Sequence, residues 1–199
     1  MERSERNYYA SLYDIAVALN SNRAPDSILQ SIVERLAQAM DAKGCSLMLL
    51  ATDKKQLFHM TAYGLSDWYI SKGPVFVDKS ISEALDGKSI AVLDATEDER
   101  VQYPKESQKE GIASILSVPV SLREEIVGVL RIYTNKPCHF TEEDIIFVRA
   151  VANLGAIALE NARLYESVKK DYATFRRDML EWGAGVAYKG SPRQKGVKQ

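Results

Sequence analysis

The chain has 199 residues, of which 46% are hydrophobic and 27% are charged, which is typical of a globular protein with one domain and helical extensions. The formal net charge of -1 gives no general electrostatic reason to bind nucleic acid or a membrane surface. Two cysteines are too few for a disulfide framework, and neither a signal peptide nor a bilayer-spanning apolar run is recognisable, so we expect a cytoplasmic protein.

Two amphipathic helices are predicted at the start of the chain. Apolar residues recur at a four-three-four spacing over residues 8–19, with Leu12, Ile15 and Leu19 on the apolar side. The stretch 20–25 breaks this helix, and a second apolar stripe follows over residues 28–40. We assign residues 1–24 to a helix of a dimer bundle and begin the globular domain at residue 25.

Strand patterns occupy the middle of the chain. Residues 45–51 and 57–63 are predicted to form one hairpin, and residues 112–122 and 126–133 a second. Shorter strands are expected at 75–77 and 90–93, on either side of a brief helix that starts with the capping box 80–83. The connections between residues 64 and 111 are long for a compact domain, and such loops usually build a site.

A single long helix is predicted from about residue 142 to residue 182, with Thr141 and Asp144 as its cap. At 1.5 Å per residue it would be roughly 60 Å long, which is more than a small domain needs to cover one sheet. Past residue 164, large apolar side chains alternate at spacings of three and four, the pattern by which one helix buries a stripe against another. This C-terminal seam comprises Tyr165, Val168, Tyr172, Phe175, Met179 and Trp182.

The C-terminal seam predicts a homodimer, because each of its side chains left in water would forgo roughly 1.5–3 kcal/mol of burial. Asn161 lies on the same register and is a polar residue of the kind that fixes alignment in coiled coils. We expect a parallel dimer in which residues 165–182 form a coiled coil, and a disordered basic tail over residues 183–199. The predicted interface comprises Leu12, Ile15, Leu19, Asn161, Tyr165, Val168, Tyr172, Phe175 and Met179.

Several segments resemble the signature segments of GAF domains. Residues 111–120 and 128–133 resemble the fifth and sixth strands of that family, and 140–144 and 158–165 resemble the start and exit of its last helix. The segments 62–65, 87–90 and 94–95 also fall in the family's order. The resemblance implies an α+β, profilin-like fold over residues 25–164: a six-stranded antiparallel sheet with the terminal helices on one face, a small-molecule pocket on the other, and a long C-terminal coiled-coil helix.

The resemblance also bears on the cofactor. Cyclic-nucleotide phosphodiesterases contain a GAF subtype with an Asn-Lys-Phe-Asp-Glu set, which Asn135, Lys136, Phe140 and Asp144 match in part. Ile145 stands where the glutamate belongs, which disfavours a cyclic nucleotide. Phytochrome-like GAF domains hold a bilin on a pocket cysteine, and none lies between residues 64 and 111, so no covalent bilin is expected. The sequence leaves the identity of the ligand open.

Eight residues are candidates for ligand binding. Aromatic side chains in the segment where the family builds the lid of its pocket could stack on a planar ligand, or form a satellite core under a loop. Asp94 and Arg100 could clamp a charged ligand, or cap a turn and remain solvated. Further residues are expected near the pocket floor, although a one-residue error in register would turn each to the other face. The predicted set is Ser46, Tyr63, Trp68, Tyr69, Asp94, Arg100, Ser114 and Leu116.

No catalytic or metal-binding pattern stands out. Cys45, His59, Cys138 and His139 lack a compact zinc-type spacing. Free-methionine sulfoxide reductases, a GAF-like enzyme class, use several cysteines in the pocket loops, and this chain has none between Cys45 and Cys138. We therefore predict no catalytic residues and no metal site.

The predicted function is a non-catalytic sensory module that binds a small molecule on the sheet and relays its state through dimeric helices. No kinase, cyclase, phosphodiesterase or DNA-binding output segment is recognisable, so a separate signalling protein is the expected partner, with neither nucleic acid nor membrane involved. Two alternatives are a dimerisation and docking scaffold with an empty or self-filled pocket, and an enzyme of the sulfoxide-reductase kind.

Overall fold

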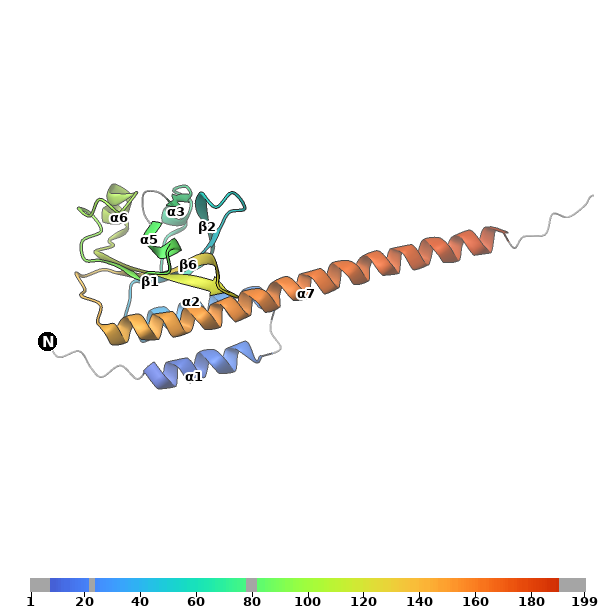
Figure 1. Ribbon diagram of the computed structural model, residues 1–199, viewed down its shortest axis with the longest axis horizontal. Coiled ribbons are helices and arrows are strands. Elements are labelled where there is room, and N and C mark those ends of the chain that lie inside the picture. Colours follow the sequence, from blue (N-terminus) through green and yellow to red (C-terminus); the bar gives the residue numbers. More distant parts are fainter. Residues whose placement is uncertain (1–7, 22–23, 78–81, 190–199) are drawn as a thin grey trace, which may run out of the picture. The chain divides into compact units, whose positions relative to one another are not determined.

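The computed structural model describes residues 8–21, 24–77 and 82–189. The described residues form one antiparallel six-stranded sheet with the strand order β3-β2-β1-β6-β5-β4, and helices cover both of its faces (Figure 1). The elements are α1 (Tyr8–Leu19), α2 (Pro25–Ala39), β1 (Gly44–Leu50), β2 (Gln56–Tyr63), α3 (Asp67–Ile70), β3 (Val75–Phe76), α5 (Ser82–Leu85), β4 (Ile90–Val92), α6 (Pro104–Glu110), β5 (Ser114–Leu122), β6 (Glu125–Thr134) and α7 (Glu142–Lys189).

One face of the sheet, the helical face, is covered by α1, α2 and the first half of α7 (Figure 1). Helix α2 buries one stripe at helical spacing, and the strands supply alternate apolar residues that meet it. Helix α1 is held against α7 by Tyr8, whose ring stacks on Phe147 at 4.1 Å and whose hydroxyl donates a hydrogen bond to Asp144. The prediction that helices from both ends of the chain cover one face is confirmed.

The other face of the sheet, the loop face, is covered by α3, α5, α6 and the irregular segments between them (Figure 1). Its second, smaller core contains Met48, Leu57, Ile115 and Val129 from the strands. The long connection between residues 64 and 111 therefore supplies the cover of this face, where the sequence predicts a site.

A β-bulge in β2 changes which residues face the helices. Thr61 lies opposite Leu47 of β1, but His59 lies opposite the next residue, Met48, so Met60 is the extra residue of the bulge. Before the bulge, odd-numbered residues of β2 point to the loop face; after it they point to the helical face. Tyr63, predicted in the ligand pocket, accordingly packs against the core under the helices.

The predicted dimer residues of α1 lie inside the protomer. Ile15 is fully buried in the core of the helical face, and Leu12 and Leu19 pack against that core. These residues complete their own domain, because α1 lies over α2 and α7 in the same chain. The outward side of α1 exposes other large side chains instead: Tyr9 (88%), Tyr13 (69%) and Val17 (52%).

Helix α7 begins with the predicted cap. Asp144 N donates to Thr141 Oγ1 at 3.2 Å, and Thr141 N donates to Asp144 Oδ2 at 2.8 Å, so each residue satisfies a backbone donor of the other. The helix continues past the expected stop after Trp182 and ends at Lys189, since single glycines cost a helix only about 1 kcal/mol each. The remainder of the predicted tail, residues 190–199, lies outside the described residues.

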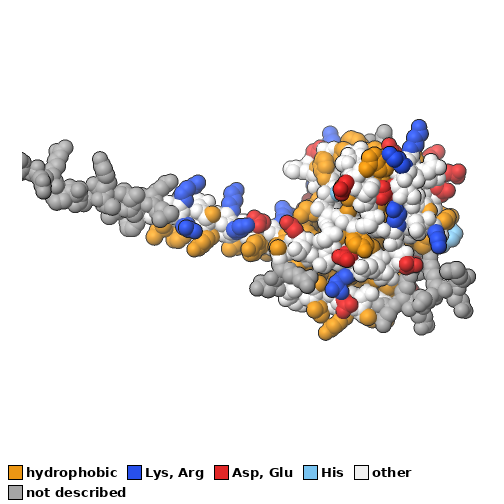
Figure 2. All heavy atoms as spheres, turned by 180° about the vertical axis from the view of Figure 1, so that it is seen from behind, with side chains coloured by type: hydrophobic (Ala, Val, Ile, Leu, Met, Phe, Trp, Pro, Cys, Tyr) orange, Lys and Arg blue, Asp and Glu red, His pale blue; other side chains and the backbone are white. Residues whose placement is uncertain are grey.

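Residues 161–199 form a compact unit separate from residues 1–160. In this unit the C-terminal seam is exposed from Tyr165 to Met179, with 51–67% of each seam side chain accessible, and Asn161 is also exposed. Figure 2 shows hydrophobic side chains along one side of this part of α7 and Lys and Arg along the other. The described part of the seam is therefore an exposed apolar stripe along this helix. The side chain of Trp182 lies outside the described residues.

Helix α7 is also long and apolar enough, by length and composition alone, to cross a membrane over Glu142–Arg177. In the most apolar window, 44% of the helix is buried inside the protein. The core helix of a soluble protein passes the same test, so this property is weak evidence for a membrane span.

Candidate ligand-binding site

A row of polar side chains crosses the middle of the sheet on the loop face. Ser46 of β1, Arg131 of β6 and Ser117 of β5 are direct cross-strand neighbours. Arg131 is only 6% exposed, and its Nε donates to Ser117 Oγ at 2.9 Å. Ser46 Oγ lies 3.0 Å from the hydroxyl oxygen of Tyr133. Because buried polar groups are expensive, such a row marks a site where polar chemistry is needed or where specificity is built in.

Helix α3 supplies the wall above this row. The ring of Tyr69 meets Tyr133 edge-on, with centroids 6.0 Å apart, and its hydroxyl lies 3.3 Å from Ser107 Oγ of α6. The ammonium of Lys72 sits 3.6 Å from the centroid of the Tyr69 ring and 5.5 Å from that of Tyr103. The wall is therefore aromatic and carries one cation.

The position of α3 is fixed by local hydrogen bonds. Ser66 caps the helix, because its Oγ accepts from Tyr69 N at 3.2 Å. The carboxylate of Glu110 in turn accepts from Ser66 N at 2.9 Å and from Ser66 Oγ at 2.5 Å. Burial opposes ionisation of Glu110, but these bonds and the charge of Lys43 lower its pKa overall. Helices α3 and α6 are thus tied together over the loop face.

His59 is the residue of this face with the least satisfied side chain. It lies on β2 before the bulge, and both of its ring nitrogens are buried without a hydrogen-bond partner in the described part of the chain. Burial first, and then the positive charges of Lys72 and Arg131, together lower the pKa of His59 to about 4. His59 is therefore neutral at pH 7.

The electrostatic character of the site is basic. The pKa of Lys72 is lowered to about 8, chiefly by burial and next by repulsion from Arg131, whereas Glu106 and Glu110 raise it less strongly. Burial also raises the pKa of Tyr69 well above its usual range, so its hydroxyl stays protonated. The loop-face polar cluster is then defined by seven residues: Ser46, His59, Tyr69, Lys72, Ser117, Arg131 and Tyr133.

The predicted ligand-binding residues are only partly brought together. Ser46 and Tyr69 belong to the loop-face polar cluster. Trp68, the residue before Tyr69 in α3, is 42% exposed, and the ammonium of Lys109 lies 3.9 Å from the centroid of its ring. Tyr63 and Leu116 pack under the helices, on the opposite side of the sheet. Their side chains therefore face away from the cluster.

The remaining three predicted residues make local structural bonds. Asp94 accepts from Thr96 N and Oγ1 at 2.8 and 2.7 Å, which caps a turn. Arg100 pairs with Asp98, with Nη2 and Oδ2 2.6 Å apart, rather than with Asp94. Ser114 donates to the carbonyl of Leu93 at 2.5 Å and accepts from Cys138 N at 2.9 Å. The turn cap considered as the alternative for Asp94 accounts for its bonds, whereas Arg100 makes an ion pair that neither alternative included.

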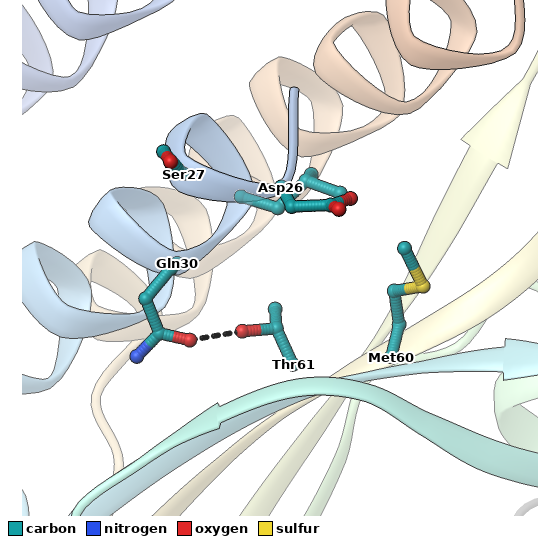
Figure 3. Close-up of a pocket in the computed structure, with 6 residues that line it drawn as sticks. Asp26, Ser27, Gln30, Met60 and Thr61 are labelled. Carbon is teal, nitrogen blue, oxygen red and sulfur yellow. Dashed lines mark hydrogen bonds between the residues drawn. The ribbon is translucent and has the colours of Figure 1, made fainter. Parts of the chain in front are cut away.

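A depression lies at the edge of the sheet, between α2 and β2. It has a volume of about 560 Å³ and is lined by Asp26, Ser27, Leu29, Gln30, Met60 and Thr61. Figure 3 shows Thr61 donating a hydrogen bond to Gln30, which also donates to the carbonyl of Ala62 at 3.1 Å. The amide of Gln30 is thus satisfied by tying the helix to the strand, and the groove gathers fewer chemically distinctive groups than the loop face.

Metal and thiol chemistry find little support among the described residues. They contain no group of three or more His, Cys, Asp or Glu side chains able to hold a metal ion. Cys45 is fully buried in the core of the helical face, where burial raises the pKa of its thiol far above the usual range. A thiol in that state is a poor nucleophile.

Five members of the cluster were missed by sequence reasoning: His59, Lys72, Ser117, Arg131 and Tyr133. Arg131 carried a usable signal, because an arginine in the middle of an apolar strand must be buried with partners. His59 and Lys72 carried none, since their positions depend on the bulge in β2 and on the placement of α3.

The chain matches a model of the GAF domain over residues 22–160. One curated relative, the methyl sulfide methyltransferase-associated sensor of Methanosarcina acetivorans, is 26% identical over 164 residues. The match covers 78% of this chain but 16% of the relative, so the chain corresponds to a small part of that protein.

Solved structures share the fold. The GAF domain of a phosphoenolpyruvate-protein phosphotransferase from Coxiella burnetii superposes with a TM-score of 0.73 at 23% identity, covering 82% of this chain and 99% of that one. The free methionine-R-sulfoxide reductase from Neisseria meningitidis, in complex with its substrate, gives a TM-score of 0.68 at 16% identity, covering 83% and 96%. At these identities the likeness concerns the fold, and it confirms the predicted architecture.

Proposed function

The chain belongs to the GAF domain family, and from that premise we propose that it is a non-catalytic sensory module, which binds a small molecule on the loop face and relays occupancy through paired helices. The observation that carries the proposal is the loop-face polar cluster. A buried arginine, two buried serines and a cation over an aromatic wall exceed what a purely structural face requires.

The curated relative supports the sensory part of the proposal. It is named as a sensor associated with a methyl sulfide methyltransferase, and its match spans 78% of this chain. Since the chain corresponds to a small part of that protein, neither its ligand nor its partner is transferred here. The proposed partner of this chain is a separate signalling protein, and the proposed setting is cytoplasmic.

The relay is proposed to run through a parallel homodimer. Exposed apolar side chains continue along the C-terminal seam from Tyr165 to Met179, and each would gain roughly 1.5–3 kcal/mol on burial. On the domain itself, α1 exposes Tyr9, Tyr13 and Val17, which replace Leu12, Ile15 and Leu19 as the α1 side of the proposed interface. A ligand shifts such a dimer only if it binds two arrangements of the helices with different affinity.

A docking scaffold is the second candidate function. Met48, Leu57, Ile115 and Val129 already fill part of the loop face with buried apolar side chains of the chain itself, as a self-filled pocket would require. The enzymatic alternative is weaker, because the thiol of Cys45 faces the helices and is deeply buried. Neither alternative accounts for the buried basic groups.

Native mass spectrometry of the purified full chain tests the proposal, because it reports subunit number and any retained small molecule together. We expect a species of twice 22.2 kDa that carries an additional small-molecule mass. The Arg131→Met variant should retain the dimer and lose that mass. A dimer that never carries a ligand under any growth condition would favour the scaffold.

A further inference from the structure

The unsatisfied imidazole of His59 points to the chemistry of the ligand. A neutral imidazole has one N–H donor and one nitrogen acceptor, and both are buried here without a partner in the described residues. An unmade hydrogen bond in a buried position is expensive, and native proteins seldom leave one without a reason. His59 belongs to the strand floor of the loop face, so a group bound at this face is within its reach.

The groups around His59 are basic. Lys72 and Arg131 are both near enough to act on the imidazole, and they also repel each other. Arg131 donates to Ser117, and the ammonium of Lys72 donates to the carbonyl of Tyr69 at 2.9 Å and lies over its ring. The carboxylates of Glu106 and Glu110 also act on Lys72, each more weakly than Arg131 does. An ammonium has three N–H donors, so the bond to the Tyr69 carbonyl leaves Lys72 able to donate to an anion.

We propose that the small molecule bound at the loop face is an anion, a carboxylate or a phosphate, which accepts hydrogen bonds from His59 and Lys72 beside Arg131. The inference rests on the proposed ligand-binding function and adds the class of ligand. The anion satisfies the N–H of His59 and compensates the repulsion between Lys72 and Arg131. The adjoining rings of Tyr69 and Tyr133 offer an apolar surface to the rest of the molecule.

The test uses the two histidines as reporters in the NMR spectrum of the full chain. The ring nitrogens of His59 are buried at the site and His139 is exposed before α7, so the two imidazole signals report separately, and a His139→Gln variant assigns them. Benzoate, inorganic phosphate and neutral benzamide are titrated to about 10 mM, a range that detects millimolar affinity. We expect benzoate or phosphate to shift the His59 signal and to leave the His139 signal in place. Benzamide should shift neither signal. Which anion acts distinguishes a carboxylate from a phosphate ligand.

Matched lysine variants separate a specific site from general attraction. Lys72→Met removes the charge and keeps much of the apolar stem, and it should weaken anion binding about ten- to a hundredfold. Lys54→Met removes a lysine that pairs with Glu125 at 2.6 Å in exposed hairpins, and it should leave binding unchanged. An unchanged far-UV circular dichroism spectrum and unfolding midpoint check that each variant is folded.

Three results would overturn the inference. The first is that benzamide shifts the His59 signal as much as benzoate does. The second is that the Lys72→Met variant binds the anion as tightly as the native chain. The third is that neither anion shifts the His59 signal while native mass spectrometry shows a retained neutral molecule. The last result leaves the proposed function intact. If no probe binds and the purified protein retains no small molecule, the proposed function falls with the inference.

Discussion

The imidazole of His59 makes stability depend on pH. Its pKa is about 4 in the folded protein and 6.5 in an unconstrained chain, so below pH 6.5 the unfolded state takes up the proton more readily. The contribution of the neutral His59 to the free energy of unfolding is therefore fully present above pH 6.5 and is lost as the pH falls towards 4. The difference corresponds to roughly 3 kcal/mol.

We predict that the His59→Leu variant lacks this pH-dependent contribution to the free energy of unfolding. Urea unfolding at pH 7 and pH 4.5 should show a smaller loss of free energy of unfolding for the variant than for the native chain. At pH 7 the variant should be at least as stable, because leucine leaves no polar atom unsatisfied. His139→Gln, at an exposed position, serves as the control and should behave like the native chain. An equal acid-induced loss in His59→Leu would contradict the assignment.

The cap of α7 is a second single-residue contribution. Thr141→Ala removes the acceptor of Asp144 N and should lower the free energy of unfolding by about 1 kcal/mol. Thr141→Ser keeps the hydroxyl and should lower the free energy of unfolding much less. Denaturant unfolding at pH 7 measures both, and equal losses in the two variants would show that the methyl group, rather than the hydrogen bond, is what matters.

At single positions, the sequence predicts what strand alternation and helix periodicity control. The cap at Thr141 follows from such a pattern and is present, and Ser46, whose face the sequence left open, lies on the loop face. Tyr63 does not, because the bulge at Met60 shifts the alternation by one residue and no residue in β2 announces it. Leu116 was placed on the wrong face for the same kind of reason, an uncertain starting register.

Among the elements, α6 is the one that sequence reasoning omitted. Its residues, Pro104–Glu110, are almost all polar, so no apolar periodicity marks it. Its ends did carry a signal: Pro104 lies in the first turn, and Gly111 ends the helix in a left-handed conformation with φ 75°. The strands and long helices were predictable because each buries a regular apolar stripe.

Substitutions of two glycines by alanine should change the stability of the protein in opposite directions. At Gly128 of β6 an added Cβ would meet the carbonyl oxygen of Met48 at 2.2 Å, whereas at Gly155 of α7 it would meet nothing within 4 Å. We predict that Gly128→Ala lowers the free energy of unfolding by about 2 kcal/mol or more. Gly155→Ala should raise it by roughly 0.5–1 kcal/mol, because alanine is the better helix former. Thermal or urea unfolding measures both, and a destabilised Gly155→Ala variant would contradict the described packing of α7.

For the whole molecule, the proposed relay depends on what covers the C-terminal seam. Val168 and Phe175 are both more than 60% exposed in the single chain and occupy equivalent positions one heptad apart. Val168→Lys with Phe175→Lys should therefore abolish dimerisation, because two cations per helix would be buried at the paired stripe. Ser167→Lys with Ala173→Lys adds the same charge at positions facing away from the stripe and should leave the dimer intact.

Sedimentation velocity of the full chain at micromolar concentration tests this pairing most directly. The account predicts a species of twice 22.2 kDa for the native chain and for Ser167→Lys with Ala173→Lys, and a monomer for Val168→Lys with Phe175→Lys. A monomeric native chain, with the amides of residues 165–179 still protected from hydrogen exchange, would contradict the relay through paired helices and leave only an isolated ligand-binding domain.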